Sequence, residues 1–282
     1  MDTLIIGIDA GFGQLMQSLS SPWLGAFFGT VTLLGDPLLW LLALAYLHWK
    51  GDVKSALFFA GAILLAYAVV GPLKEITARP RPFADGLPLA AGNGGYSFPS
   101  GHATTVSSVL GYFWSGAALH KALAVCIVLL VMLSRVYLGV HYLSDVVVGT
   151  LLGFGIGYTM QIAGRKLSGA NWEKRKPAAL LSIIALASLA IAEGVLAASP
   201  LGSALAGYFL GVLALWFMGE NPRASGGGML IMQGIGFAVL AIILAVANSN
   251  GLKPWGFLFA GLWVSLLLPL LWARLSPAPR PG

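Results

Sequence analysis

Three short clusters of polar residues stand out in an otherwise apolar sequence. The first is Lys74-Glu-Ile-Thr-Ala-Arg-Pro-Arg81-Pro82, the second is Pro99-Ser100-Gly101-His102, and the third joins Ser134-Arg135 to His141 and Asp145. Arginine forks match the geometry of phosphate oxygens, and lysine supplies a compact positive charge. Because few carboxylates accompany Lys74, Arg81 and Arg135, these cations predict a site for an anion.

The same clusters contain a pair of histidines. His141 and Asp145 are four residues apart, which would place them on one face of a helix. Asp145 can then accept a hydrogen bond from one ring nitrogen of His141, fixing its tautomer and leaving the other nitrogen as a nucleophile. His102 remains to protonate the leaving oxygen. Ser100 and Gly101 begin a predicted helix, whose N-terminal N–H groups favour an anion.

The composition places these clusters in a membrane protein. Of the 282 residues, 58% are hydrophobic and 9% are charged, whereas an ordinary soluble domain has about 25% charged residues. The mean hydropathy is +0.85. These values exclude a soluble enzyme, a disordered chain and a nucleic-acid-binding protein. Continuous apolar runs of about 20 residues favour helices over a barrel.

We predict an all-α, polytopic membrane helical bundle with nine transmembrane helices. The apolar runs long enough to cross are 23–48, 54–73, 102–119, 121–140, 142–164, 177–198, 201–218, 229–247 and 255–273. Residues 1–20 are too polar to cross, and their apolar residues recur at helical spacing, so we expect an amphipathic helix in the membrane interface. Gly35-Asp36-Pro37 predicts a kink, and Gly149, Gly153 and Gly157 predict a close-packing helix face.

Nine spans would put alternate loops on opposite sides of the membrane. One side then holds 11 Lys and Arg residues and the other holds 5, four of them in the polar clusters. The positive-inside rule predicts a cytoplasmic C-terminus and polar clusters that face the periplasm from the inner membrane. The ends of 54–73 and 121–140 and the starts of 102–119 and 142–164 share that side. The topology therefore brings all three clusters to one membrane face.

The clusters resemble the three-part signature of the type-2 phosphatidic acid phosphatase superfamily, over about residues 1–165. This resemblance implies a metal-independent phosphohydrolase without a cofactor. It implies that His141 attacks phosphorus and forms a phosphohistidine, that Asp145 orients His141, and that His102 acts as acid and then as base. A bell-shaped pH profile follows, because His141 must be neutral while His102 is protonated. The resemblance also implies a set of residues that hold the phosphoryl oxygens: Lys74, Arg81, Ser100, Gly101 and Arg135.

Three further residues are accessory candidates. Arg79 lies between motif positions and is either an accessory cation or, as we favour, an interface anchor. Ser134 opens the third cluster. Glu193 lies within the predicted span 177–198, where an ionisable group is costly and therefore a candidate for function, or else a side chain that reaches the interface. No spacing of histidine, cysteine and carboxylate residues predicts a metal site.

The sequence divides into a catalytic core (1–165), a basic cytoplasmic loop (166–176), a four-span domain of unknown role (177–275) and a disordered tail (276–282). The expected function is a lipid phosphatase that removes the terminal phosphate of a lipid mono- or diphosphate. On resemblance alone, undecaprenyl pyrophosphate ranks first and phosphatidylglycerophosphate second. Transfer of the phosphoryl group to another acceptor, and a phosphatase fused to a lipid-transport unit, stay open. The expected partners are the membrane and the lipid substrate, with a homodimer as an option.

Overall fold

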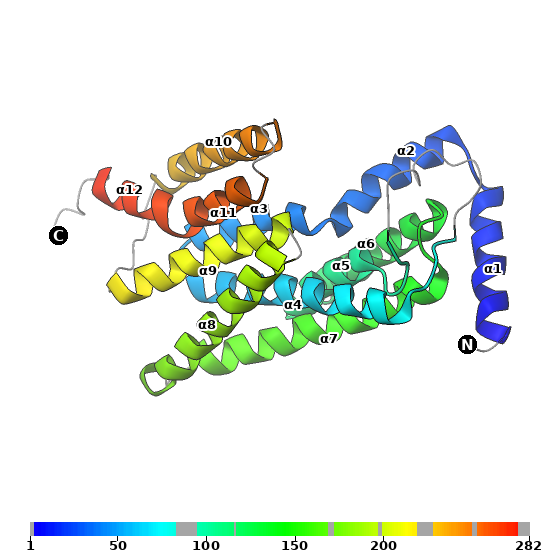
Figure 1. Cartoon of the computed structure of the whole chain (residues 1–282), viewed down its shortest axis with the longest axis horizontal. Helices are drawn as coiled ribbons and strands as arrows, with labels where there is room; N and C mark the ends of the chain where they lie inside the picture. Colours follow the sequence, from blue (N-terminus) through cyan, green and yellow to red (C-terminus); the bar gives the residue numbers. More distant parts are fainter. Residues whose placement is uncertain are drawn as a thin grey trace. The chain divides into compact units, whose positions relative to one another are not determined.

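The computed structural model describes residues 3–82, 95–115, 117–168, 172–196, 199–218, 228–249 and 253–275, and all regular elements in these ranges are helices (Figure 1). The predicted disordered tail, 276–282, lies outside them. The helices, in chain order, are α1 (Thr3–Ser18), α2 (Pro22–Val31), the short η1 (Thr32–Gly35), α3 (Pro37–Trp49), α4 (Val53–Thr77), α5 (Gly101–Tyr112), α6 (Ala118–Tyr137), α7 (Leu143–Ser168), α8 (Trp172–Leu196), α9 (Pro200–Met218), α10 (Gly228–Ser249), α11 (Lys253–Leu262), the π-helical η3 (Trp263–Leu267) and α12 (Leu268–Leu275).

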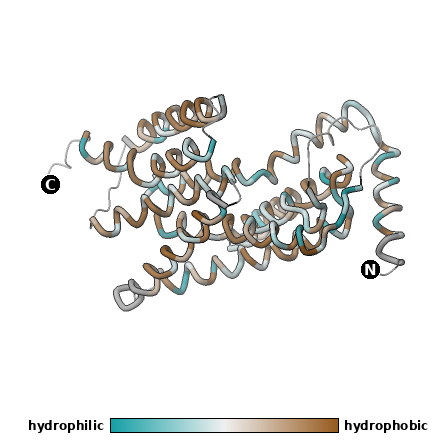
Figure 2. Tube along the Cα trace, in the orientation of Figure 1, coloured by the Kyte–Doolittle hydropathy of each residue, from teal (hydrophilic) through white to brown (hydrophobic). Residues whose placement is uncertain are grey.

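The number of membrane spans is smaller than the sequence predicts. Among the described residues, six helices are long and apolar enough to cross, or seven if the bent pair α2–η1 and α3 counts as one span. Figure 2 shows the apolar residues along these helices. The all-α membrane bundle is therefore confirmed, and the count of nine is wrong.

Two of the predicted spans are not among these six or seven helices. Helix α5 has 12 residues, which at 1.5 Å per residue gives about 18 Å against a hydrocarbon core of about 30 Å. In α8 the residues with described side chains form the apolar segment Ala178–Gly194, which is grouped with the shorter apolar helices. The charge comparison between alternate loops assumed nine crossings, so it no longer supports an orientation.

The predicted kink at Gly35-Asp36-Pro37 is confirmed. The helices on its two sides are bent by 49°. Pro37 has no N–H group to continue a helix, and the Asp36 side chain accepts a hydrogen bond from the backbone N–H of Leu38 at 2.8 Å. The carboxylate thus caps α3 at the bend.

The chain forms two compact units that alternate along the sequence. The first unit comprises Met1–Leu39 and Leu65–Ile162, and the second comprises Trp40–Leu64 and Ala163–Gly282. Helix α4 therefore contributes its first half to one unit and its second half to the other. The domain boundaries given from the sequence stay a prediction.

The first unit is built on close contact between α5 and α7. A Cβ on Gly149 would lie 2.7 Å from the carbonyl oxygen of Ser100, and Cβ atoms on Gly153 and Gly157 would collide with the carbonyls of Thr104 and Ser108. This confirms the predicted close-packing face. Since only glycine allows such an approach, the sequence brings the start of α5 against the start of α7.

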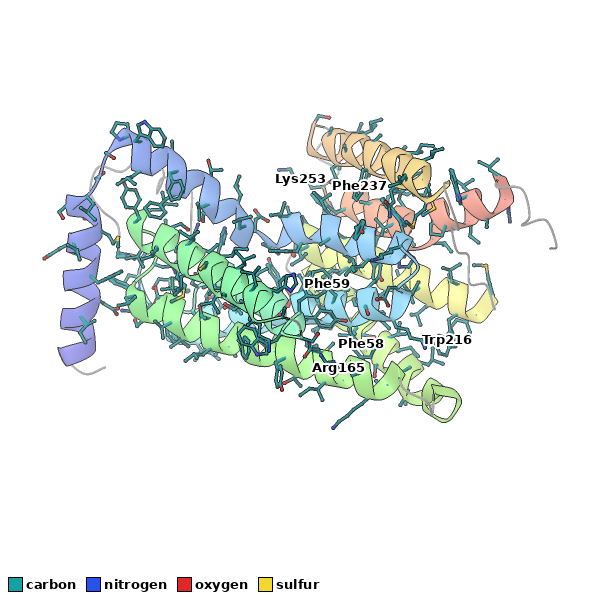
Figure 3. The ribbon with its side chains drawn as sticks, turned by 180° about the vertical axis from the view of Figure 1, so that it is seen from behind. Phe58, Phe59, Arg165, Trp216, Phe237 and Lys253 are labelled. Carbon is teal, nitrogen blue, oxygen red and sulfur yellow. The ribbon has the colours of Figure 1, made fainter. Side chains whose placement is uncertain are left out.

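The second unit is held by polar contacts of aromatic side chains. The indole N–H of Trp49 donates to the carbonyl of Val264 at 2.9 Å, and the buried His48 ring lies 3.1 Å from the hydroxyl of Tyr208. In the same unit, Phe58 of α4 is labelled in Figure 3. Its ring packs against Gly164, where an added Cβ would lie 3.1 Å from the ring.

Candidate active site

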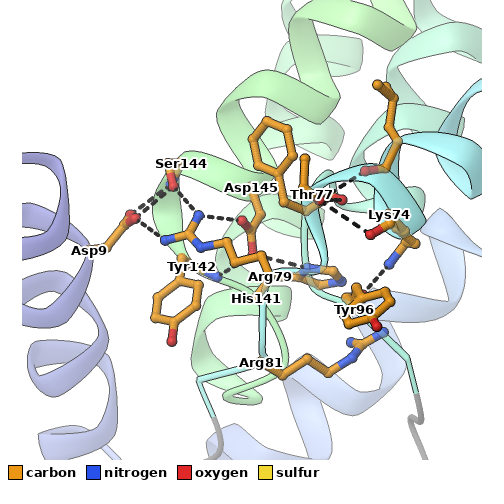
Figure 4. A network of polar contacts seen from close by, with 12 residues as sticks. Asp9, Lys74, Thr77, Arg79, Arg81, Tyr96, His141, Tyr142, Ser144 and Asp145 are labelled. Carbon is orange, nitrogen blue, oxygen red and sulfur yellow. Dashed lines mark hydrogen bonds and ion pairs between the residues drawn. The ribbon is translucent and has the colours of Figure 1, made fainter. Parts of the chain in front are cut away.

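The three polar clusters meet in the first unit, where the backbone N–H of Ser100 donates to the carbonyl of Asp145 at 3.1 Å. Figure 4 shows residues of the first and third clusters. The first cluster spans the end of α4 and the segment that follows it. The second opens α5, and the third closes α6 and opens α7. Four helix ends thus supply the side chains. The spatial grouping expected from the sequence is present, even though α5 is too short to span a membrane.

A tight turn reverses the chain between Arg135 and His141. After α6, the N–H of Gly139 donates to the carbonyl of Val136 at 2.9 Å, and the N–H of Val140 donates to the carbonyl of Arg135 at 3.3 Å. Gly139 has φ of +67°, a left-handed conformation that glycine adopts without strain. The turn returns His141 toward the end of the helix that carries Arg135.

His141 lies in this turn and not on a helix, since α7 begins at Leu143. The expected contact with Asp145 nevertheless forms, because Asp145 folds back over the helix start. Its Oδ2 accepts the backbone N–H of Tyr142 at 2.9 Å, as in a capping box. The same Oδ2 lies 3.4 Å from Nδ1 of His141, without the alignment of a hydrogen bond. Contacts of this kind are often long before substrate binds.

The imidazole of His141 is in its neutral form near pH 7. The side chain is 2% exposed, and burial lowers its pKa to about 4, against the opposing effect of Asp145. A neutral ring with Nδ1 facing a carboxylate leaves Nε2 as the nitrogen able to act as a nucleophile.

Three cations near this histidine bind only neutral oxygens. Lys74 donates to the carbonyl of Tyr96 at 2.6 Å, and Arg81 donates to the carbonyls of Gly95 and Val140 at 3.1 Å each. The buried Arg135 donates to the hydroxyl of Thr32 at 2.7 Å. Within the ranges described, no carboxylate forms an ion pair with Lys74, Arg81 or Arg135. Their positive charges are therefore available to an anion.

Buried polar atoms at the same place have no partner. Among the described residues they are the Oγ of Ser100 and the Nε of Arg135. A buried donor without a partner costs about 1–3 kcal/mol, so an anion that satisfied these donors would be bound favourably. Gly101 follows Ser100 as the first residue of α5, and the start of a helix favours negative charge.

His102, the second residue of α5, belongs to the same site. Lys74, Arg81, Arg135 and His141 all lie within electrostatic range of its ring. The Cβ of His102 packs against Gly35, where an added Cβ would lie 2.7 Å from it. Across the described segments, no group of three or more histidine, cysteine and carboxylate residues could hold a metal ion.

The accessory candidates have different positions. Arg79 is not an interface anchor: its guanidinium donates to Asp145 at 2.6 Å and to Asp9 at 2.7 Å. The hydroxyl of Ser134 donates to the carbonyl of Val131 in its own helix. Glu193 lies on α8, in the second unit, and is half-buried.

Sequence analysis missed one residue of this network. Asp9 is 3% exposed on α1, among residues assigned only to an interfacial helix. An available signal was its helical spacing from Phe12 and Met16, three and seven residues on, because an acid on the apolar side of a helix requires a cation or a donor. Asp9 also lines a cavity of about 390 Å³ that reaches Arg81 and His141.

Comparison with known proteins identifies this arrangement. The model of the PAP2 superfamily, the type-2 phosphatidic acid phosphatases, matches residues 55–168. A lipid A 4'-phosphatase of Porphyromonas gingivalis is 31% identical over 170 residues, which are 55% of this chain and 72% of the relative. The chain belongs to the PAP2 superfamily. It is thus a membrane enzyme of a metal-independent lipid phosphate phosphatase family, and the match contains all three polar clusters.

Further proteins are similar to the chain over a smaller share of it or at lower sequence identity. The decaprenylphosphoryl-5-phosphoribose phosphatase of Mycobacterium tuberculosis is 36% identical over 106 residues, which are 37% of this chain and 58% of the relative. Two crystal structures match with a TM-score of 0.49 and 26% identity. A PAP2-type phosphatidylglycerolphosphate phosphatase of Bacillus subtilis covers 60% of this chain and 90% of its own, and LpxE of Aquifex aeolicus covers 54% and 93%.

Proposed function

We propose that this PAP2 protein hydrolyses the terminal phosphate of a membrane lipid through a phosphohistidine on His141. The observation that carries the proposal is the environment of the His141 imidazole. It is buried and neutral, its Nδ1 faces Asp145, and it lies among three cations that have no carboxylate partner in the described chain. Electrostatic stabilisation of the transferring group is the main source of rate in phosphoryl transfer.

The proposed reaction has two steps. In the first, the Nε2 lone pair of His141 attacks phosphorus, the bond from phosphorus to the lipid oxygen breaks, and that oxygen takes a proton from His102. In the second, His102 removes a proton from water, whose oxygen attacks phosphorus and releases inorganic phosphate and His141. Lys74, Arg81 and Arg135 balance the charge of the phosphoryl oxygens in both steps. Ser100 and Gly101 are proposed to hold the same oxygens.

For the substrate, we place lipid phosphomonoesters ahead of undecaprenyl pyrophosphate. The relatives named above are phosphatases of lipid A and of a decaprenyl-linked phosphoribose, both of them sugar phosphates. The residues of α1 that line the cavity support this order of substrates. Apart from Asp9, which is paired, it consists of uncharged residues that include Gln14 and Gln17. Amide groups suit hydroxyl groups of a sugar or glycerol, whereas a second phosphate would require further cations.

Phosphate release by the purified protein in detergent tests the proposal. The substrates are a lipid A phosphate, phosphatidylglycerophosphate, phosphatidic acid and undecaprenyl pyrophosphate, each with a chelator present. Wild type should release phosphate and His141→Ala should not. If wild type releases none, the proposal is wrong as stated, and phosphate found on an added lipid or sugar would establish a transferase.

The double variant Gln14→Ala, Gln17→Ala tests the substrate order. We expect KM to rise for the lipid A phosphate and to stay unchanged for phosphatidic acid, which offers no free hydroxyl beside its phosphate. Equal changes for both substrates would contradict a role of the two amides in recognising the carrier.

We also propose that the site faces the periplasm, with support from one helix. Helix α7 is a candidate span that starts beside the site at Asp145 and ends with Arg165 and Lys166. Basic residues favour the cytoplasmic end of a span, so the opposite end faces outward. With the single cysteine, Cys126, replaced by serine, an impermeant thiol reagent should label Ile76→Cys in intact cells and spare Lys166→Cys. The reverse result would overturn the orientation.

A further inference from the structure

Helix α1 reaches the catalytic carboxylate through a chain of short polar contacts (Figure 4). Arg79 lies between two acids: its Nη2 donates to Oδ2 of Asp9 at 2.7 Å and its Nη1 donates to Oδ1 of Asp145 at 2.6 Å. All three side chains are shielded, with exposed fractions of 12% for Arg79, 3% for Asp9 and 0% for Asp145. The aromatic ring of Tyr142 covers the guanidinium at 4.0 Å, which restricts its movement further.

Asp9 also holds the first turn of α7 directly. Its Oδ1 accepts the backbone N–H of Ser144 at 2.8 Å, and its Oδ2 accepts the hydroxyl of Ser144 at 2.6 Å. The hydroxyl oxygen in turn accepts from Arg79 at 2.7 Å. Ser144 precedes Asp145, so a carboxylate from α1 binds the start of the helix that carries Asp145. Burial opposes ionisation of Asp9, but the bonds from Ser144 and Arg79 outweigh it and hold its pKa below its ordinary value.

The charges of the three side chains explain what Asp9 adds to the pair of Arg79 and Asp145. Arg79 alone would form a neutral pair with Asp145 and draw electron density away from it. With Asp9 on its other side, the guanidinium is shared, and the group Asp9–Arg79–Asp145 keeps one net negative charge. Oδ2 of Asp145, the oxygen that faces Nδ1 of His141, then remains a strong acceptor.

We propose that Asp9 is a positioning residue for the reaction: through Arg79 and Ser144 it fixes Asp145 in the orientation that holds the Nδ1–H tautomer of His141. This inference rests on the proposed function of His141 as the nucleophile. It gives α1 a task at the site in place of a passive position in the membrane interface.

The test combines kinetics with a spectroscopic measurement on Asp9→Asn. The control is Asp52→Asn, which removes the same charge from another carboxylate that accepts a backbone N–H, that of Ser55 at 3.1 Å. Outer partners of reactive groups are worth about 10- to 100-fold in metal sites, and we expect a fall of this size in kcat for Asp9→Asn, with KM nearly unchanged. Asp52→Asn should match wild type in both constants.

Imidazole 15N NMR reports the tautomer without depending on turnover. The chain has four histidines, and the His141 signals are assigned by their loss in His141→Ala. We expect the Nδ1–H form in wild type and in Asp52→Asn, and a mixture of tautomers in Asp9→Asn. Ser144→Ala keeps every charge and removes one bond to each of Asp9 and Arg79, so it should show a smaller change in the same direction. If Asp9→Asn does not fold, the tautomer of His141 in Ser144→Ala tests the positioning role.

Either of two results would overturn the positioning role. One is wild-type kcat in Asp9→Asn, and the other is a lowered kcat with the His141 tautomer unchanged, which would indicate a purely structural role. Failure of the proposed function looks different. In that case wild type itself releases no phosphate, whereas the comparison of tautomers still tests the link from Asp9 to His141.

Discussion

The close packing of Gly35 against His102 gives a direct test of His102 as the acid for the leaving group. In Gly35→Ala the new Cβ would lie 2.7 Å from Cβ and 3.0 Å from Cδ2 of His102. Carbon atoms in contact are normally about 3.5–4.0 Å apart, so the histidine must move by about 1 Å. A shift of about 1 Å in a catalytic group can cost about 100-fold in rate. We expect that loss for Gly35→Ala on an alkyl lipid phosphate.

The assay compares two leaving groups on the same variants. An alkyl lipid oxygen needs a proton as it leaves, whereas a nitrophenolate leaves without one. Because His102 also acts as the base in the second step, the quantity to compare is kcat/KM, which reports formation of the phosphohistidine. The loss of kcat/KM in Gly35→Ala should be about 100-fold on the lipid and small on a nitrophenyl phosphate. It should not exceed the loss in His102→Ala, for which removal of a general acid predicts about 100- to 10,000-fold. Gly29→Ala is the matched control, since a Cβ there meets no atom within 4 Å.

Two results would refute the reasoning. If folded Gly35→Ala hydrolyses the lipid at the wild-type rate, the contact does not position His102. If kcat/KM falls equally for both substrates, the variant damages phosphate binding or the nucleophile, and the contact with Gly35 does not act through protonation of the leaving group.

Further predictions follow from single contacts. Gly153→Ala should lower the free energy of unfolding by about 1–3 kcal/mol through overpacking, whereas Gly155→Ala, which meets no atom within 4 Å, should not; thermal unfolding in detergent measures both. Arg135→Lys replaces the guanidinium fork, in which one nitrogen binds Thr32 and another can face phosphate, with a single ammonium nitrogen; kcat/KM should therefore fall about 10- to 100-fold, the value of a charged hydrogen bond of about 1.5–3 kcal/mol. Protonation removes the nucleophilic lone pair of His141, and burial lowers the pKa of this residue to about 4. Loss of the nucleophile should therefore lower kcat/KM only as pH falls through about 4. A fall of kcat/KM near pH 6.5, the ordinary pKa of histidine, would contradict this environment.

Local patterns in the sequence predict much of the fold and of the site. Apolar runs and glycine spacing depend on residues within a few turns of one another, and they correctly give the helices, the kink at Asp36 and the α5–α7 contact. The joining of the clusters also follows from sequence, because each stands at a helix end. The exact helix lengths do not, since an apolar run shows no sign that α5 ends at Tyr112 and that α6 starts only at Ala118.

The network around Arg79 could not be predicted from spacing. Asp9 and Ser144 are 135 positions apart, so neither period nor motif connects them. A cation near a helix end is most often an interface anchor, and that general preference led to the wrong interpretation of Arg79. Only the burial of Asp9, which requires a partner, carried the missing information.

The alternation of the two units limits how this chain can be shortened or recombined. Trp49 and His48 precede the catalytic motifs in sequence, yet their hydrogen-bonding partners are Val264 and Tyr208. A chain cut after α7 would keep the two rings and lose both partners. The segment that follows α7 therefore cannot be removed without breaking contacts of residues that precede it. Any chimera that exchanges it must also exchange Trp40–Leu64, the other part of the same unit.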